Sequence, residues 1–530
     1  MTSQNAFEPE SARRTLFEAL VEAATFHGKN RIILSDADQQ ALSYKKLILS
    51  ALVLGDKLAR LTMPNEKVGV LLPNAAGAAV TLLGLNAFGR TAALLNFTAG
   101  PRNLVSALRT GPIAIVLTSR RFIAAAKLED TVAAMAGAEP ISGRKTRVVY
   151  LEDLRKKISI SDKVRGAVRS LYPKRFSRRA GMTPDSPAVV LFTSGTEGAP
   201  KGVVLTNANL VANARQILAH AGGMLTPQDI VLNPLPMFHS FGLTAATLMP
   251  LLGGMHVVLY PSPLHYKQVA RTIGEAKVSV LFATDTFLMG YARAAASGEL
   301  ASVRYVIAGA ERVKDATRTA WEKSGAIILE GYGATECSPV IACNLPNPNR
   351  PGTVGPLLPG LETKLETVAG ITQGGRLKIR GPNVMAGYLL AEAPGVLQKP
   401  AGGWHDTGDI VTIGENAVLT IRGRAKRFAK IGGEMVSLAA VEALSAGLWP
   451  DAQHVVVALP DERKGEQLIL VTDKGDADRA SLAAYCKAAG ITELWIPRAV
   501  LVVEGIPVSA AGKVDLQATQ KLVEMTRPLL

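Results

Sequence analysis

The sequence Leu191–Asn207, LFTSGTEGAPKGVVLTN, places a loop rich in glycine and hydroxyl groups directly after an apolar run. The apolar residues AVVLF predict a buried strand that ends where the loop begins. Glycine lets the backbone approach a ligand closely, so that successive N–H groups can point at one anion. Further donors would be the side chains of Thr193, Ser194, Thr196 and Lys201. The stretch therefore predicts an anion-binding loop, most simply for a polyphosphate.

Two familiar motifs do not fit this loop. The phosphate loop of NTPases needs Gly-Lys followed by Ser or Thr, whereas Pro200 precedes Lys201 here and Gly202 follows it. The nucleophile turn of serine hydrolases needs a glycine two residues before the serine, and Phe192 holds that position before Ser194. An ordinary glycine-rich turn with solvated side chains has a similar composition. The loop alone therefore leaves several functions open.

Length and composition indicate a folded protein of several domains. With 530 residues the chain should hold at least two domains, and 48% hydrophobic with 19% charged residues indicates a well-buried core. The three cysteines form no CxxC pair, which predicts a reducing compartment without disulfides or structural zinc. The uncharged stretch Val68–Gly89 contains Pro73 and Asn74, which favours a strand, loop and helix over a membrane span. We expect a cytoplasmic protein.

The formal net charge of +15 is unevenly distributed. Residues 144–179 hold thirteen Lys and Arg against three acidic residues, whereas residues 427–530 hold eleven basic against thirteen acidic residues. Neither an aromatic-interleaved basic groove nor a zinc-finger or RNA-recognition signature accompanies the excess, so nucleic acid is not an expected partner. The charge predicts a local basic patch on an enzyme.

Short apolar runs rich in β-branched residues alternate with helical patterns through most of the chain. Among them are KVGVLL, IAIVLTS, AVVLFTS, HVVLYP and AIILEGYG, which predict largely parallel strands. After Gly352, GRLKIRGP and AVLTIRGR predict antiparallel hairpins, and EMVSLAAVEALSAG predicts a helix in a small α+β unit. The expected fold class is α/β. A large domain, residues 1–424, would hold layered α/β sheets and a β-rich subdomain, and residues 425–530 would form a small, mobile α+β domain.

The loop TSGTEGAPKGV resembles the phosphate loop of the AMP-forming acyl-adenylate superfamily, which includes acyl-CoA ligases, luciferases and peptide-synthetase adenylation domains. Further elements follow in that family's order: PMFHSFG from Pro236, AGAE from Ala308, GYGATE from Gly331, GGWHDTGD from Gly402, GRAKRFAKIGGEMVS from Gly423 and PVSAAGK from Pro507. The resemblance covers about the whole chain. It implies that ATP and Mg²⁺ are used and that no prosthetic group is tightly bound.

The resemblance also implies which residues bind ATP. The phosphates would be held by Thr193, Ser194, Gly195, Thr196, Gly198 and Lys201. The adenine would lie against Gly309, Ala310, Glu311, Tyr332 and Gly333. Thr335 would bond the α-phosphate and Glu336 would hold Mg²⁺, because a hydroxyl donor and a hard carboxylate suit a metal-bridged phosphate.

The later motifs imply three further roles. Asp409 and Arg424 would contact the ribose, and Lys426 would be the hinge. Gly432 and Gly433 would line a channel for a pantetheine arm. Lys513 would bridge the α-phosphate and the substrate carboxylate, as a catalytic residue beside Lys201, Thr335 and Glu336. Its flanking residues Val508 and Ala511 depart from the family's usual pattern.

The substrate expected from these motifs is a fatty acid. His239 and Phe241 would line the entry of the carboxylate and the acyl pocket. Relatives that activate amino acids place an acidic residue in this element, and FHSFG contains none, although Asp285 leaves an amine-bearing substrate open. The apolar side chains nearby suit an aliphatic chain.

Four segments bear on the acceptor: FHSFGLT, LYPSPLHY, ILEGYGATE and GRAKRFAKIGGEMVSL. Together they resemble the ligase half of the bifunctional 2-acylglycerophosphoethanolamine acyltransferase/acyl–acyl carrier protein synthetase. The likeness implies transfer to the phosphopantetheine thiol of acyl carrier protein, while coenzyme A is the alternative acceptor. A non-catalytic acyl or nucleotide binder on the same fold is the alternative from another class.

The basic stretch Asp162–Ala180 predicts a short helix that Pro173 ends. Val164, Val168, Leu171 and Tyr172 have the spacing of one helical face, with basic residues beside it. The stretch is either a solvated linker or a docking surface. As a docking surface it would bind acidic carrier protein or anionic lipid, which would place the protein peripherally on the inner face of the cell membrane.

Overall fold

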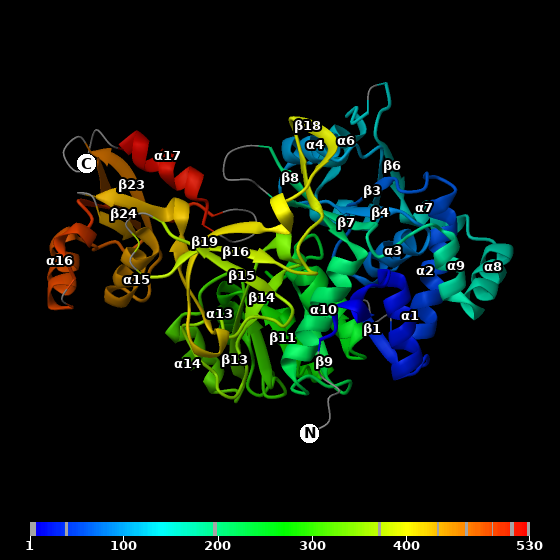
Figure 1. Cartoon of the computed structure of the whole chain (residues 1–530), viewed down its shortest axis with the longest axis horizontal. Helices are drawn as coiled ribbons and strands as arrows, with labels where there is room; N and C mark the ends of the chain where they lie inside the picture. Colours follow the sequence, from blue (N-terminus) through cyan, green and yellow to red (C-terminus); the bar gives the residue numbers. More distant parts are fainter. Residues whose placement is uncertain are drawn as a thin grey trace. The chain divides into compact units, whose positions relative to one another are not determined.

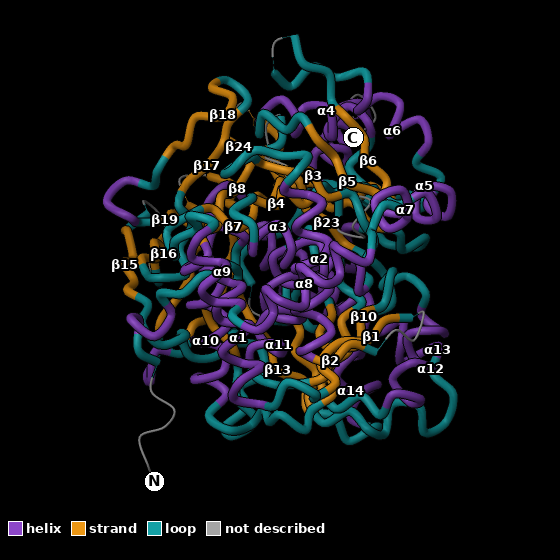
Figure 2. The backbone as a smooth tube through the Cα atoms, turned by 90° about the vertical axis from the view of Figure 1, so that its right-hand side faces the viewer, coloured by secondary structure: helices purple, strands orange, loops and turns teal. Residues whose placement is uncertain are grey.

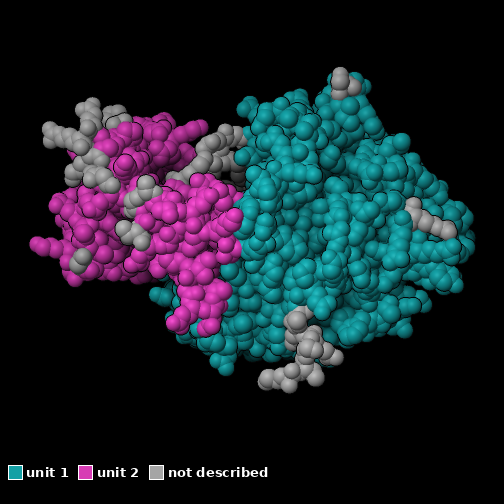
Figure 3. All heavy atoms as spheres, viewed as in Figure 1, with its two compact units in different colours: residues 1–362, 380–405 teal, residues 363–379, 406–530 magenta. Residues whose placement is uncertain are grey.

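The computed structural model of the chain describes residues 7–37, 41–141, 143–193, 199–368, 371, 373–431, 434–461, 465–489, 491–508 and 514–526. For Arg179 and Lys426 it describes the backbone alone. The chain groups into two compact units (Figure 3). Unit 1 comprises Met1–Glu362 and Arg380–His405, and unit 2 comprises Thr363–Ile379 and Asp406–Leu530.

The first sheet of unit 1 has eight strands in the order β14-β13-β12-β11-β9-β10-β1-β2. The strands are β1 (Ile32–Asp36), β2 (Leu42–Ser43), β9 (Ile230–Asn233), β10 (His256–Leu259), β11 (Val280–Ala283), β12 (Tyr305–Ala308), β13 (Ile327–Gly333) and β14 (Val340–Cys343). From β13 to β1 the strands run parallel, and β2 and β14 pair antiparallel at the edges.

The second sheet of unit 1 also has eight strands, in the order β18-β17-β8-β7-β4-β3-β5-β6. The strands are β3 (Lys67–Val70), β4 (Thr91–Leu94), β5 (Ile115–Thr118), β6 (Arg147–Tyr150), β7 (Pro187–Thr193), β8 (Lys201–Thr206), β17 (Gly387–Leu390) and β18 (Ala393–Gln398). Strands β7, β4, β3, β5 and β6 run parallel, whereas β8, β17 and β18 extend the sheet antiparallel. The predicted strands KVGVLL, IAIVLTS and AVVLFTS are confirmed as β3, β5 and β7.

Helices cover both sheets of unit 1 (Figure 1). They are α1 (Leu16–His27), α2 (Tyr44–Ala59), α3 (Ala76–Ala87), α4 (Pro101–Thr110), α5 (Arg120–Ala126), α6 (Glu129–Ala136), α7 (Leu151–Lys156), α8 (Ile160–Leu171), α9 (Pro173–Arg179), α10 (Asn207–Ala221), α11 (Met249–Leu252), α12 (Tyr266–Ala276), α13 (Asp285–Ala294) and α14 (Asp315–Glu322). The stretch Val68–Gly89 forms β3 and α3, as predicted. Within the described ranges, no helix is long and apolar enough to cross a membrane.

The largest apolar core of unit 1 joins its two sheets. It contains Leu34 on β1, Val257 on β10, Val70 on β3 and Leu191 on β7, together with apolar residues of α2 and α3. Because one core includes strands of both sheets, the loops at their strand ends are held in a fixed arrangement. This arrangement positions the candidate site described below.

Unit 2 contains two smaller sheets. The first has the order β15-β16-β19-β20, and the second has the order β22-β21-β24-β23 with β25 beside β24. The strands are β15 (Glu362–Glu366), β16 (Gly375–Arg380), β19 (His405–Ile413), β20 (Leu419–Arg424), β21 (Phe428–Ile431), β22 (Glu434–Ser437), β23 (His454–Asp461), β24 (Gly465–Thr472) and β25 (Ala499–Val502). The helices are α15 (Leu438–Leu448), α16 (Arg479–Ala488) and α17 (Leu516–Thr526).

In unit 2, one helix is shorter than predicted and the predicted domain boundary falls within the unit. The helix predicted over EMVSLAAVEALSAG begins only at Leu438, because EMVS forms β22 with Val436 buried, and Ser437 caps the helix. The domain boundary at residues 424/425 stays a prediction. In the structure, residues 406–424 group with residues 425–530 in unit 2. Strand β20 packs on α15, and the Ser437 hydroxyl donates to the Arg422 carbonyl at 3.3 Å.

Two glycines allow α2 and α3 to cross closely. A Cβ at Gly55 on α2 would lie 2.7 Å from the carbonyl oxygen of Gly84 on α3, and a Cβ at Gly84 would lie 2.9 Å from that of Ala51. We therefore expect Gly55→Ala to lower the free energy of unfolding by about 1–3 kcal/mol, because the helices must separate. Urea unfolding followed by circular dichroism measures the change.

Gly77→Ala is the matched control on α3, because nothing lies within 4 Å of its Cβ position. There the same substitution should leave stability unchanged or raise it by about 0.5–1 kcal/mol through backbone entropy. Equal destabilisation by both substitutions would show that the close crossing is not the cause.

Candidate active site

The predicted phosphate loop connects β7 to β8, two strands that pair antiparallel. Thr193, the last residue of β7, pairs with Lys201, the first residue of β8. The residues Ala188–Leu191 are buried, which confirms the buried strand before the loop. The Lys201 side chain is exposed. Ser194–Gly198, including the predicted ligands Gly195 and Thr196, lie outside the described residues, so their phosphate contacts stay predictions.

One tyrosine contacts both predicted ionic groups of the phosphate site. The Tyr388 hydroxyl donates to Glu336 Oε1 at 2.7 Å, and Lys201 Nζ lies 5.8 Å from the centroid of the Tyr388 ring. Tyr388 reaches this place because β17 pairs with β8, which sets Tyr388 opposite Val203. The backbone of Glu336 is also fixed, since its carbonyl accepts from Met385 N at 2.7 Å. Sequence reasoning missed Tyr388, which has no motif of its own in AGYLL.

Thr335 lies beside the element that was predicted to admit the carboxylate. The Ser240 hydroxyl donates to Thr335 Oγ1 at 3.4 Å, so the PMFHSFG and GYGATE motifs meet. Gly333 is required at this corner, because a Cβ there would lie 2.2 Å from the Pro339 carbonyl oxygen. Tyr332 beside it is buried. The structure therefore brings together the two elements that were predicted to meet the α-phosphate and the carboxylate.

The backbone of the PMFHSFG element is held by β9. Asn233 at the end of β9 donates from Nδ2 to the Gly242 carbonyl at 2.9 Å, and its Oδ1 accepts from Leu235 N at 2.9 Å. A Cβ at Gly242 would lie 2.5 Å from two carbonyl oxygens, which explains the glycine. This tight turn presents His239, whose exposed ring packs on Phe238 with centroids 4.6 Å apart. Its predicted role at the entry of the carboxylate stays a prediction.

The residues that directly follow β12 contact the PMFHSFG element. A Cβ at Gly309 would come within 3.1 Å of the Phe241 ring, so the absence of a side chain lets that ring approach the backbone. Ala310 next to it has φ 69°, in the left-handed region that a residue with a side chain rarely adopts. The Glu311 carboxylate accepts from Thr286 N at 3.0 Å and therefore holds the start of α13. Gly309 is buried beneath the Phe241 ring and Ala310 is exposed, and the adenine contacts of residues 309–311 stay a prediction.

Asp285 has a structural role. It is buried, and its Oδ1 accepts from Lys314 N at 3.0 Å. A carboxylate engaged in this way is poorly placed to meet a substrate ammonium, so the interpretation that left an amine-bearing substrate open loses its support.

The residues near Glu336 fit a magnesium ion bound together with phosphate. Mg²⁺ in such sites takes one or two protein carboxylates and fills its shell with phosphate oxygens and water. Glu336 supplies one carboxylate, and Tyr388 orients it. Across the described ranges, no group of three or more His, Cys, Asp or Glu could hold a metal by itself. Burial raises the pKa of the Cys337 thiol, so this neighbour stays uncharged.

In unit 2 the two predicted ribose contacts lie side by side. Asp409 on β19 pairs with Arg424 on β20, and Arg424 Nε lies 3.2 Å from Asp409 Oδ1. The Asp409 backbone N–H donates to Thr407 Oγ1 at 3.1 Å, which helps to fix the buried carboxylate. The arrangement fits both assignments, and the ribose role stays a prediction.

Several predicted site residues cannot be located. Gly432, Gly433 and Lys513 lie outside the described residues, and of Lys426 only the backbone is described, in the turn between β20 and β21. Their roles as channel, catalytic lysine and hinge stay predictions.

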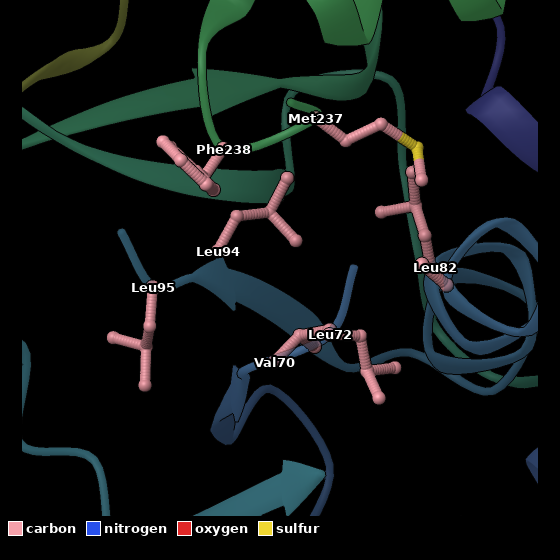
Figure 4. Close-up of a pocket in the computed structure, with 8 residues that line it drawn as sticks. Val70, Leu72, Leu82, Leu94, Leu95, Met237 and Phe238 are labelled. Atoms are coloured by element: carbon pink, nitrogen blue, oxygen red, sulfur yellow. The ribbon is translucent and has the colours of Figure 1, made fainter. Parts of the chain in front are cut away.

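A small apolar cavity is lined in part by residues of the PMFHSFG element (Figure 4). It is lined by Val70, Leu72, Ala78, Leu82, Leu94, Leu95, Met237 and Phe238. Its volume is about 20 Å³, which holds about one water-sized sphere. Met237 and Phe238, which precede His239 in the PMFHSFG element, are two of the lining residues. At this volume, a longer apolar group could enter only if lining side chains moved.

Comparison with known proteins agrees with this geometry. A family model described as AMP-binding enzyme matches residues 20–389. The long-chain-fatty-acid–CoA ligase of Escherichia coli O157:H7 is 27% identical over 477 residues, which cover 85% of this chain and 84% of that protein. The 4-coumarate–CoA ligase 1 of Arabidopsis thaliana is 27% identical over 485 residues, which cover 86% and 83%.

Solved structures share the fold. The O-succinylbenzoate coenzyme A synthetase of Bacillus subtilis, in complex with ATP and magnesium ion, matches with a TM-score of 0.76 at 23% identity. The match covers 96% of this chain and 100% of that chain. It confirms the expected α/β fold with a large N-terminal and a smaller C-terminal part.

The contact between Tyr388 and Glu336 leads to a test. Tyr388→Phe removes the hydroxyl that orients the carboxylate, and loss of such a partner typically costs about tenfold or more in metal affinity. We expect about a tenfold rise in the magnesium concentration that half-saturates ATP–pyrophosphate exchange. The magnesium titration distinguishes this positioning role from a general loss of folding.

Tyr291→Phe is the control, because its hydroxyl donates to the Pro263 carbonyl at 3.0 Å as a packing contact. It should lower stability and leave the magnesium titration unchanged. An unaltered half-saturation in Tyr388→Phe would refute the assignment.

Proposed function

Because this chain belongs to the AMP-binding enzyme family, we propose that it activates a fatty acid and passes the acyl group to the thiol of a phosphopantetheine arm. Family membership makes the chain an ATP-dependent, acyl-adenylate-forming ligase. A carboxylate is a poor acyl donor because its charge must be relieved before a nucleophile can attack. The carboxylate therefore attacks the α-phosphate of ATP and pyrophosphate leaves. The thiol then attacks the acyl-adenylate carbonyl, and AMP leaves.

In the first step, the formation of the acyl-adenylate, residues of unit 1 would have separate roles. Lys201 would neutralise the outer phosphates of ATP, and Thr335 would donate to the α-phosphate. Glu336, oriented by Tyr388, would hold Mg²⁺, which supplies positive charge to the phosphates when it is bound. Lys201 and Tyr388 already lie next to each other, so little reorganisation is needed when ATP binds.

A fatty acid as substrate is supported by the surroundings of His239. The turn that presents His239 is backed by a cavity whose lining residues are all apolar. The carboxylate of Asp285 is buried and accepts a backbone N–H from Lys314, so it is poorly exposed to a substrate ammonium. An aliphatic chain that displaced Met237 and Phe238 would meet apolar surface only. The name of the Escherichia coli relative, a long-chain-fatty-acid–CoA ligase, is the observation that carries the choice of a fatty acid, and the apolar lining of the cavity supports it.

For the acceptor we propose coenzyme A first, because the relatives compared above bear the names of coenzyme A ligases. Acyl carrier protein is the second candidate, because FHSFGLT, LYPSPLHY and ILEGYGATE resemble an acyl–acyl carrier protein synthetase. Both acceptors end in the same thiol, so unit 1 does not distinguish them.

A competition assay tests the proposal. Enzyme, Mg²⁺, ATP and labelled palmitate are mixed with equal concentrations of coenzyme A and holo-acyl carrier protein. We expect pyrophosphate release and label chiefly on coenzyme A. Label chiefly on the carrier protein would reverse the order of acceptors, and no pyrophosphate with any acid would indicate a binder without catalysis.

We further propose that Lys513 serves the first half-reaction alone, and that residues 425–530 pivot at Lys426 between the two steps. Lys513→Ala should reduce acyl-adenylate formation by about a hundredfold or more, because a charge on the reacting groups is lost. Thioester formation from preformed acyl-adenylate should be spared. Single-turnover assays of each half-reaction measure the two effects.

Lys521→Ala on α17 is the control, an exposed lysine near Lys513 in sequence, and it should alter neither half-reaction. Equal losses in both half-reactions for Lys513→Ala would indicate a structural role.

A further inference from the structure

Helix α8 carries an exposed row of apolar side chains. The row consists of Ile160, Val164, Val168, Leu171 and the adjoining Tyr172, which are 80%, 55%, 59%, 71% and 70% exposed. Their spacing is that of one helical face, which confirms the predicted face and extends it by one turn. Figure 2 shows α8 on the outer side of α2, facing the viewer. We call this row the α8 stripe.

The opposite face of α8 is polar and turned towards the protein. Asp162 is 1% exposed and pairs with Lys57 of α2 at 2.5 Å, and Arg169 pairs with Asp56 of α2 at 2.5 Å. Gly166 between them lets the helix approach Val53. The hydrogen bond from Lys57 lowers the pKa of Asp162, so this inner carboxylate is ionised at neutral pH. Surface helices ordinarily bury their apolar face, so α8 is inverted.

The basic residues of this region divide into two sets. Arg165, Arg169, Lys174 and Arg178 form ion pairs with acidic residues of α1 and α2 and therefore fix α8 and α9 in place. A second set is exposed and forms none of the ion pairs found among the described residues: Lys156, Lys157, Lys163 and Arg175. These cations precede, flank and follow the α8 stripe in sequence.

We propose that the α8 stripe docks on the surface of an anionic lipid bilayer, with α8 lying in the plane of the headgroups. Aliphatic side chains would enter the acyl boundary, and Tyr172 would sit at headgroup level, where aromatic side chains with a polar tip are favoured. Lys156, Lys157, Lys163 and Arg175 would meet lipid phosphates. The helix needs no partner groove for this, because its own apolar face is the binding surface.

Two other occupants fit less well. A second copy of this chain would bring the same four cations face to face, which like-charge repulsion opposes. A folded acidic protein would have to bury at least about 1,000 Å² in total, whereas α8 is a single helix about 18 Å long with a narrow stripe. A bilayer surface has no such minimum area, because the side chains of a short stripe can enter it individually.

The docking should be weak, reversible and sensitive to salt. The stripe spans about three turns, because α8 ends at Leu171 and Pro173 opens α9. Each basic residue near an anionic leaflet strengthens binding by about fivefold at low salt, and this part is screened as salt is added.

The test compares two Val→Glu substitutions at equal exposure. Val168→Glu changes the stripe, whereas Val396→Glu on β18 changes a valine that is 58% exposed elsewhere. Binding is measured by co-sedimentation with vesicles of phosphatidylcholine and phosphatidylglycerol, without ATP or fatty acid. We expect Val168→Glu to weaken binding about tenfold and Val396→Glu to leave it unchanged. Vesicles of phosphatidylcholine alone should bind the wild type at least tenfold more weakly.

The readout does not depend on the proposed catalytic function, and ATP–pyrophosphate exchange should be unaltered in both variants. Absence of binding by the wild type, or equal loss in the two variants, would overturn the proposal. Unchanged vesicle binding with a raised KM for acyl carrier protein in Val168→Glu would assign the stripe to an acidic protein instead. Loss of a dimer in sedimentation velocity, with vesicle binding unchanged, would assign it to a second copy.

Discussion

The antiparallel pairing of β17 with β8 is the contact on which the candidate active site depends. It sets Tyr388 opposite Val203, next to the hairpin that carries Lys201. From there the tyrosine hydroxyl reaches Glu336, which follows a strand of the other large sheet. A hydrogen bond to a carboxylate is roughly twice as strong as one between neutral groups. One short strand thus links the predicted phosphate lysine to the predicted metal ligand.

The sequence was most informative where one physical signal dominates. Runs such as AVVLFTS predict buried strands because β-branched residues suit a sheet covered on both faces, and β7 confirms this. Glycines at the motif corners were similarly informative. Gly242 and Gly333 stand where a Cβ would meet a carbonyl oxygen within 2.5 Å or less, so local sterics require them. Order along the chain then predicted which motifs belong to one site.

Prediction failed where long-range pairing overrides local preference. Strand β4 was missed, because TAAL contains no β-branched residue beyond Thr91 and is a strand through its place between β3 and β7. The residues EMVS look helical alone but pair with β21. Tyr388 acquires its role only from the partner strand. For Asp285 the sequence suggested a ligand-binding role that the structure does not support. Its charge suggested a contact with a substrate ammonium, but the carboxylate is buried and accepts from Lys314 N.

Helix α8 shows why a count of charges misleads without geometry. The basic residues around it suggested an electrostatic docking surface, yet several of them neutralise acids of α1 and α2. Burial of Asp56 opposes its ionisation, but the hydrogen bond from Arg169 and the charges of the neighbouring arginines together outweigh burial and lower its pKa. The helix is therefore attached by its polar face, an arrangement that leaves five apolar side chains in water. Exposed apolar surface forgoes about 25 cal/mol for each Å² that could be buried. Ordinary packing would reverse the helix, so the inverted orientation is best explained by an apolar environment that the isolated chain lacks.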